Sequence, residues 1–150
     1  MTLSENIVDQ IKTAMKAGDK VRLETLRSLR ALILEFEKSG VDREMTSDDE
    51  FKILNSSAKK RKDAIEQYEA VGRTDTANAE RAELAIIMEF LPAQLTDVEV
   101  QLEVMAIAAS INATQPSDFG KLMGAATKAL KGKADGTLIQ SVAKRILSGE

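Results

Sequence analysis

Apolar residues recur every three to four positions along the whole 150-residue chain, and no stretch alternates apolar and polar residues as a half-buried strand would. Turn-forming residues divide this pattern at Gly18, Gly40, Gly72 and the Leu91-Pro92 pair. The chain is therefore predicted to be all-α, with a four-helix amino-terminal part joined at Leu91-Pro92 to a three-helix carboxy-terminal domain. These domains span residues 1–92 and 93–150.

The amino-terminal part is predicted to hold four helices, over residues 4–17, 19–38, 47–71 and 76–90. Gly18 ends the first helix and Asp19 can cap the second, so the short connection predicts an antiparallel hairpin. The first helix is expected to turn Met15 inward together with its isoleucines. Ser47 and Glu50 have the spacing of a capping box at the start of the third helix.

The third helix carries the densest basic run of the sequence, residues 59–62. Four consecutive positions spread around a helix, so this run predicts a solvated surface rather than one flat patch. Arg61 differs because it falls on the apolar stripe. An unpaired buried charge would be very costly, so Arg61 is expected to cover the core with its stem and pair with an acid from a neighbouring helix.

The carboxy-terminal domain is predicted to begin with a helix from Thr96 to Ile111, opened by a second capping box of Thr96 with Glu99. Two further helices follow, one capped by Ser117 and the other by Asp135. The inward face of the helix from Thr96 is predicted to consist of four apolar residues, namely Val98, Leu102, Met105 and Ala109.

The helix after Ser117 has two faces, one apolar and one carrying two glycines among lysines. Each interior glycine costs a helix about 1 kcal/mol relative to alanine, so two on one face call for a reason. A face without side-chain bulk lets another backbone come close, and lysines favour a negatively charged one. This surface is suited to a phosphate backbone, unless the glycines let a neighbouring helix pack tightly. Its residues are Gly120, Lys121, Gly124, Lys128 and Lys131.

Charge and composition exclude many other functions. From Pro116 onward six basic residues face three acidic ones, although the whole chain has a net charge of −3. Only 3% of the residues are aromatic, which removes base stacking on exposed rings as a binding mechanism. With no cysteine and no histidine, the chain has no disulfide, thiolate zinc site, cysteine nucleophile or histidine base. No catalytic residue, metal ligand or cofactor is predicted.

Other compositional signals concern location and nucleotide binding. No P-loop or dinucleotide fingerprint is present, because Gly120 and Gly124 lie within a helix rather than after a strand. No apolar run is long enough to span a membrane, and the first residues lack the pattern of a signal peptide. A cytoplasmic protein without a membrane partner is expected.

Several ordered motifs resemble the YqeY family over essentially the full length of the chain. The matching segments are Lys12-Thr13-Ala14-Met15-Lys16 with Asp19-Lys20, Arg27-Ser28-Leu29-Arg30, Lys60-Arg61-Lys62-Asp63-Ala64-Ile65-Glu66, Ala70-Val71-Gly72-Arg73, Glu83-Leu84-Ala85-Ile86-Ile87, Leu91-Pro92-Ala93-Gln94-Leu95, Gly120-Lys121-Leu122-Met123-Gly124 and Lys131-Gly132-Lys133-Ala134-Asp135-Gly136. The resemblance implies an all-helical fold in two parts.

The carboxy-terminal part of that family is similar to the tail domain of the B subunit of the glutamine-dependent aminoacyl-tRNA amidotransferase, which helps to hold tRNA. The resemblance thus implies tRNA as a partner, and an amidotransferase or another protein as a second one. The expected nucleic-acid-binding residues are Gly120, Lys121, Gly124, Lys128, Lys131, Gly132 and Lys133.

The resemblance also implies a carbon–nitrogen ligase activity with glutamine as amido-N-donor. Such chemistry needs an activated nucleophile and an ATP site, and the sequence shows neither. The leading hypothesis is a non-catalytic tRNA-binding helical protein associated with tRNA-dependent amidation. The alternatives are a protein-interaction module whose glycine face docks a partner helix, and an accessory component of such a ligase.

Overall fold

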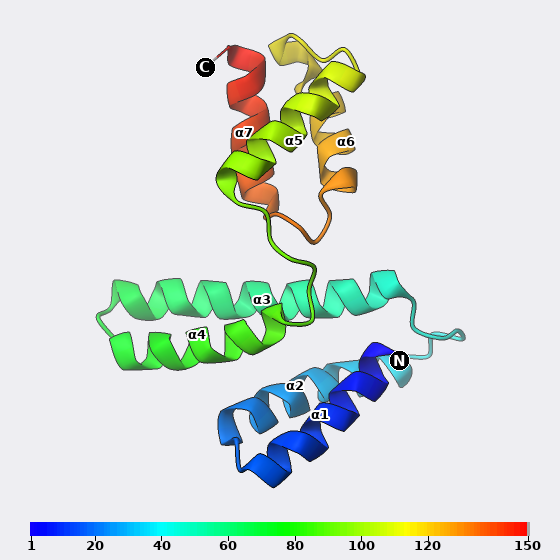
Figure 1. Cartoon of the computed structure of the whole chain (residues 1–150), viewed down its shortest axis with the longest axis vertical. Helices are drawn as coiled ribbons and strands as arrows, with labels where there is room; N and C mark the ends of the chain where they lie inside the picture. Colours follow the sequence, from blue (N-terminus) through cyan, green and yellow to red (C-terminus); the bar gives the residue numbers. More distant parts are fainter. Residues whose placement is uncertain (150) are drawn as a thin grey trace. The chain divides into compact units, whose positions relative to one another are not determined.

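A computed structural model describes residues 1–149 and confirms the all-α fold (Figure 1). This part of the chain forms seven α-helices and one short 3₁₀ helix, and no strand. The helices are α1 (Leu3–Ala17), α2 (Lys20–Glu37), α3 (Ser47–Ala70), α4 (Thr74–Met88), α5 (Asp97–Ser110), η1 (Pro116–Asp118), α6 (Phe119–Ala129) and α7 (Gly136–Ser148). Contacts divide the chain into two compact units, Met1–Leu91 and Pro92–Glu150.

The first unit consists of two helical hairpins, α1 with α2 and α3 with α4 (Figure 1). Gly18 ends α1 in the left-handed conformation at φ 69°, and the Asp19 side chain accepts the Arg22 backbone N–H at the start of α2. The predicted antiparallel hairpin is thereby confirmed. The buried core of the first unit comprises Ile7, Ile11, Ala14, Leu26, Leu29, Ile33, Leu54, Ala58 and Ile87.

Three details of this unit differ from the sequence prediction. Met15 is exposed, because the apolar stripe of α1 is narrower than expected and only its other members reach the core. The capping box at α3 uses Thr46 and Asp49 instead of Ser47 and Glu50. Arg43 donates to the Asp49 carboxylate at 2.5 Å, which favours the capping box that uses Asp49. Helix α4 likewise begins and ends two residues earlier than predicted.

Arg61 behaves as its position on the apolar stripe predicted. Its Nη1 lies 2.9 Å from Glu80 Oε2 and 2.5 Å from Glu83 Oε2, both on the neighbouring helix α4. All three side chains are about a quarter exposed or less. Burial raises the pKa of Glu83, while the Arg61 charge counteracts that rise. The ion pairs therefore hold α3 and α4 together at a partly buried position.

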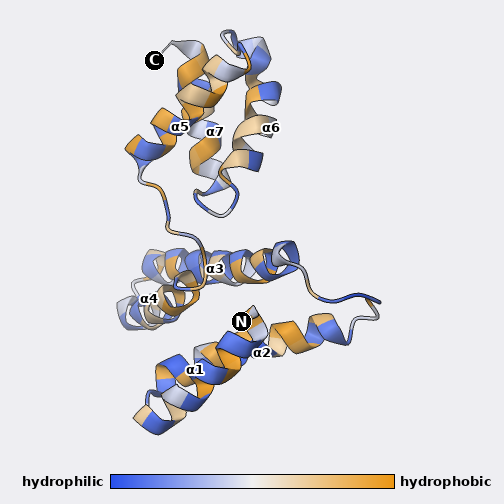
Figure 2. Ribbon diagram, turned by 45° about the vertical axis from the view of Figure 1, so that its right-hand side comes forward, coloured by the Kyte–Doolittle hydropathy of each residue, from blue (hydrophilic) through white to orange (hydrophobic). Residues whose placement is uncertain are grey.

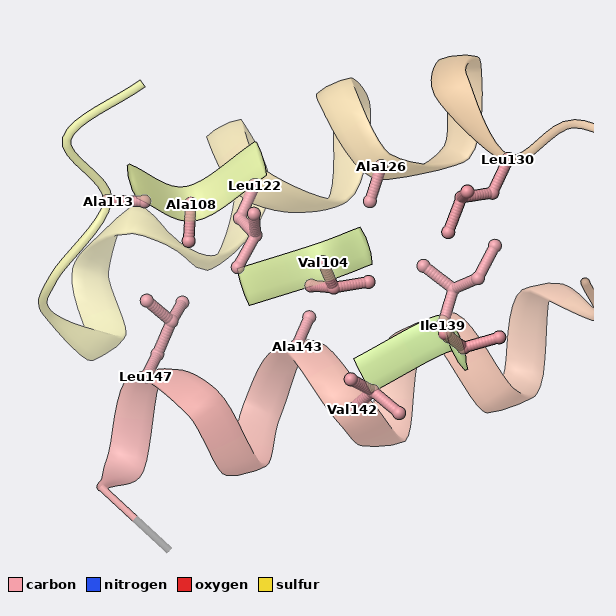
Figure 3. Close-up of a cluster of buried hydrophobic side chains, with 11 residues drawn as sticks. Val104, Ala108, Ala113, Leu122, Ala126, Leu130, Ile139, Val142, Ala143 and Leu147 are labelled. Atoms are coloured by element: carbon pink, nitrogen blue, oxygen red, sulfur yellow. The ribbon is translucent and has the colours of Figure 1, made fainter. Parts of the chain in front are cut away.

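The second unit packs α5, α6 and α7 around a core of its own, shown in Figure 3. Two hydrogen bonds connect the start of this unit to the turn between α6 and α7. The Leu95 N–H donates to the Lys133 carbonyl at 2.8 Å, and Gln94 Nε2 donates to the Gly132 carbonyl at 2.6 Å. The buried core is formed by Val100, Val104, Ala108, Ala113, Leu122, Ala126, Leu130, Ile139, Val142, Ala143 and Leu147.

The predicted inward face of α5 is wrong. Val98, Leu102, Met105 and Ala109 are exposed, and the buried residues are Val100, Val104 and Ala108. Both faces of the helix are apolar, so periodicity alone does not decide between them. The buried face carries only valine and alanine, whose small side chains let α5 lie close to α6 and α7.

The predicted caps of this unit are correct at α5 and α7 but not at α6. Thr96 and Asp135 accept the Glu99 and Thr137 backbone N–H groups, respectively. Glu99 bonds the Thr96 hydroxyl at 3.0 Å. Ser117 is no N-cap, because it lies inside η1 and α6 starts at Phe119 without a side-chain cap.

Candidate nucleic-acid interface

Helix α6 separates an apolar face from an open one. Leu122 and Ala126 are fully buried and point into the core in Figure 3. Gly120 and Gly124 lie on the other side of the helix and are exposed. The sequence placed both glycines on this side because positions four apart share a helix face.

Packing within the second unit does not explain these two glycines. A side-chain carbon built at either position would meet no atom within 4 Å. Neither glycine has the positive φ that only glycine adopts easily, in contrast to Gly18 and Gly132. Because an alanine would fit both positions, tight packing against the other helices of this unit does not explain them.

The four lysines of the predicted interface are all exposed, and they form a strip rather than a cluster. Lys121 and Lys128 lie seven residues apart on α6, which corresponds to about 10 Å along the axis. Lys131 and Lys133 follow in the turn to α7. That turn contains Gly132 at φ 79°, and its Lys133 carbonyl accepts the Leu95 N–H.

Lys121 and Lys128 also contribute to the structure of the unit. Lys121 Nζ donates to the Ile111 carbonyl at 2.7 Å and so satisfies an acceptor at the carboxyl end of α5. Lys128 lies in the last turn of α6, where a cation suits the helix dipole. Asp118 precedes α6, and hydrogen bonds from the Thr114 and Gln115 N–H groups lower its pKa, so the carboxylate is charged. The strip is basic, with one acid at its beginning.

Lys144 is a neighbouring cation that the sequence prediction did not include in the interface. Its Nζ lies 5.8 Å from the centre of the Phe119 ring, at the start of α6. Both residues line a hollow of about 400 Å³ together with Pro116, Leu147 and Ser148. Phe119 and Lys144 are far apart in sequence, and only the packing of α7 on α6 brings them together. No local motif could have indicated this contact.

A second hollow, of about 350 Å³, lies between α2 and α3, and its lining combines apolar side chains such as Phe36 with serines, Glu35, Lys52 and Lys60. Ser39 in this hollow donates its hydroxyl to the Phe36 carbonyl, and Ser148 in the hollow beside Phe119 donates to the Arg145 carbonyl, so neither hydroxyl is paired with a base. Among residues 1–149 no three acidic side chains are grouped so that they could hold a metal ion. None of the helices described is both long and apolar enough to cross a bilayer.

The sequence comparison identifies the family. Residues 4–147 match the model of the Yqey-like proteins. The chain belongs to the YqeY family. This match runs from the first turn of α1 to the last turn of α7, so the YqeY assignment covers both units and confirms the resemblance seen in the motifs. No curated protein matches the chain.

Proposed function

We propose that this YqeY protein is a non-catalytic, tRNA-binding helical protein associated with tRNA-dependent amidation, and that it binds RNA through the exposed face of α6. The observation that supports this proposal is the open space over Gly120 and Gly124. Two glycines in one helix lower its stability, and packing within the second unit gives no reason for them. Close approach of a backbone from another molecule would explain why glycine is used at both positions.

Phosphates are the groups that suit this face. The bare helix backbone admits a second backbone, and Lys121, Lys128, Lys131 and Lys133 border it with positive charge. Lysine contacts phosphate as a point charge and reads no base edge. Three or four such contacts give weak binding that depends strongly on salt and little on sequence.

The choice of tRNA among RNAs rests on the likeness of the carboxy-terminal motif to the amidotransferase tail domain. Ligase activity in this chain alone has no support from the site, since neither hollow provides an activated nucleophile or a phosphate-binding loop. The amidation chemistry would belong to another protein. This chain would contribute only contacts to the tRNA.

A titration of labelled tRNA at several salt concentrations tests the proposal. The variant Lys128→Ala/Lys131→Ala/Lys133→Ala should bind tRNA at least about tenfold more weakly at low salt. Removing one lysine–phosphate interaction also flattens the dependence of log K on log salt by about one unit. The slope should therefore decrease by about two to three.

A matched control removes the same charge from the first unit. Lys38→Ala/Lys59→Ala/Lys62→Ala takes away three exposed lysines far from α6 in sequence. It should leave affinity and slope close to the wild-type values. Equal losses in the two variants would show that only net charge matters, and unchanged tRNA affinity in the first would contradict the proposal.

The alternative of a partner helix docking on the glycine face predicts a different outcome. Gly124→Leu adds bulk without changing charge. It should weaken the binding of an RNA backbone and of a protein helix alike. The triple lysine variant separates the two, since a protein helix packed on glycines depends little on salt. A protein complex that survives nuclease treatment and lysine removal, but not Gly124→Leu, would favour the alternative.

A further inference from the structure

Helix α5 has a second apolar face that the core of its unit does not use. Val98 is 67% exposed, Leu102 62% and Met105 49%, and Ala109 lies exposed beside them. The opposite face of the same helix, formed by Val100, Val104 and Ala108, is buried. Figure 2 shows several hydrophobic segments, coloured orange, along α5. A helix that is apolar on both sides is normally covered on both sides.

The spacing of the exposed residues indicates what covers them. Positions 98, 102, 105 and 109 are separated by four, three and four residues, which is the repeat that helices use to pack on one another. The stripe spans twelve residues, or about 16 Å along the helix axis. It fits the apolar face of another helix over about three turns.

The charges beside the stripe restrict the partner further. Glu99 and Glu103 lie exposed along one side of it, and Asp97 is exposed at its beginning. Helix α5 carries no lysine or arginine. Glu99 keeps its carboxylate close to the helix by bonding the Thr96 hydroxyl. A covering helix is therefore favoured if it carries cations next to its apolar residues.

These charges also argue against two other occupants. A second copy of this chain would place acidic residues against acidic residues along the same stripe. An RNA backbone would meet carboxylates and apolar side chains instead of the lysines of α6.

We propose that the outer face of α5 (Val98, Leu102, Met105 and Ala109) binds an amphipathic helix of a partner protein that has lysine or arginine beside its apolar stripe. This surface is separate from the glycine face of α6 and goes beyond the tRNA-binding function. It gives the carboxy-terminal unit two different binding surfaces, one for a polyanion and one for a basic helix.

Synthetic helical peptides provide the test with the full-length protein. One fluorescent peptide of about 14 residues carries leucines at the four-three-four spacing and lysines beside them, and its match carries glutamates instead. At about 150 mM salt, where exposed charges still act over roughly 8 Å, anisotropy should show at least about tenfold tighter binding of the lysine peptide. Leu102→Gln should weaken this binding by about tenfold or more.

The charge preference can be inverted in the protein. Glu99→Lys/Glu103→Lys should bind the glutamate peptide more tightly than the lysine peptide. Val71→Gln is the matched control for Leu102→Gln, because Val71 is 70% exposed but follows α3 in the other unit. It should leave peptide binding unchanged. The triple lysine variant of α6 should also bind the peptide normally, which separates failure here from failure of the tRNA proposal.

Several results would overturn the inference. Equal binding of both peptides, or no effect of Leu102→Gln, would mean that the stripe does not recognise a basic helix. A wild-type dimer in sedimentation that Leu102→Gln converts to monomer would assign the face to a second copy. NMR shifts in residues 1–91 caused by Leu102→Gln would assign it to the same chain. Loss of tRNA affinity in Leu102→Gln would assign it to RNA.

Discussion

At the scale of single residues, Arg61 shows how a charge is accommodated on an apolar stripe. The guanidinium bonds Glu80 and Glu83 of α4 at 2.9 and 2.5 Å, so it satisfies two partly buried carboxylates at once. Removing one partner of a buried ion pair lowers the free energy of unfolding by more than the intact pair contributes, because the remaining charges are left without compensation. Solvent reaches about a quarter of each side chain and reduces this cost.

Arg61→Ala should lower the free energy of unfolding by about 1–2 kcal/mol at pH 7. Because burial already raises the pKa of Glu83, loss of Arg61 should raise it further. A carboxyl with a raised pKa in the folded state is penalised as pH rises through that pKa. The deficit of Arg61→Ala relative to the wild type should therefore shrink near pH 4, where more of the carboxyls are protonated.

Urea unfolding at the two pH values measures this deficit. Adding Glu83→Gln to Arg61→Ala should recover part of it at pH 7, since one of the two carboxylates is then neutral. Arg81→Ala is a suitable comparison, because Arg81 pairs with Glu69 at a more exposed position between the same two helices. Arg81→Ala should lower the free energy of unfolding by much less than Arg61→Ala does. A deficit that is independent of pH would show that only the packing of the Arg61 stem matters.

At the scale of elements, periodicity was sufficient wherever a helix has one apolar face. The two faces of α6, and the stripe of α1 except for Met15, could be predicted because other residues occupy the opposite side of each helix. Helix α5 has no polar side of this kind, and the better-spaced stripe of larger residues is the exposed one. Which face is buried depends on the space that α6 and α7 leave, and a single helical pattern does not contain that information.

The helix caps show a similar limit. Thr46-Ser47 offers two hydroxyls in succession, and both have an acid three residues later. The Arg43 contact with Asp49 selects the first of them. The lysines and glycines of the candidate interface could be predicted from sequence, whereas the contact of Lys144 with Phe119 depends on tertiary packing.

The glycines of α6 lead to a prediction about element stability. Gly124 is helical and has open space at its side-chain position, so Gly124→Ala should raise the free energy of unfolding by about 0.5–1 kcal/mol. Gly18 has a φ of 69°, and Gly18→Ala should lower the free energy of unfolding by about 1–2 kcal/mol despite equally open space. Thermal or urea unfolding of both variants measures these changes. A loss of stability in Gly124→Ala would indicate that something does pack on this face.

At the scale of the whole molecule, the chain has two separate sets of buried side chains. The core of the first unit is centred on residues such as Leu26 and Leu29, and that of the second on Leu122 and Val104. The chain passes between the units at Leu91-Pro92, close to the boundary that the sequence predicted. Because each unit buries its own apolar residues, each has its own source of stability.

This arrangement predicts that damage to one core stays within its unit. Leu122 is completely buried, so Leu122→Ala should cost its unit about 2–5 kcal/mol through reduced burial and a residual cavity. In native-state hydrogen exchange, the amides of α5–α7 should lose protection by that amount, while those of α1–α4 keep theirs. Leu26→Ala, at an equally buried position of the first unit, should give the reverse pattern. If either variant lowered protection equally in all seven helices, the two units would unfold as one cooperative body, and the two cores would have to be coupled.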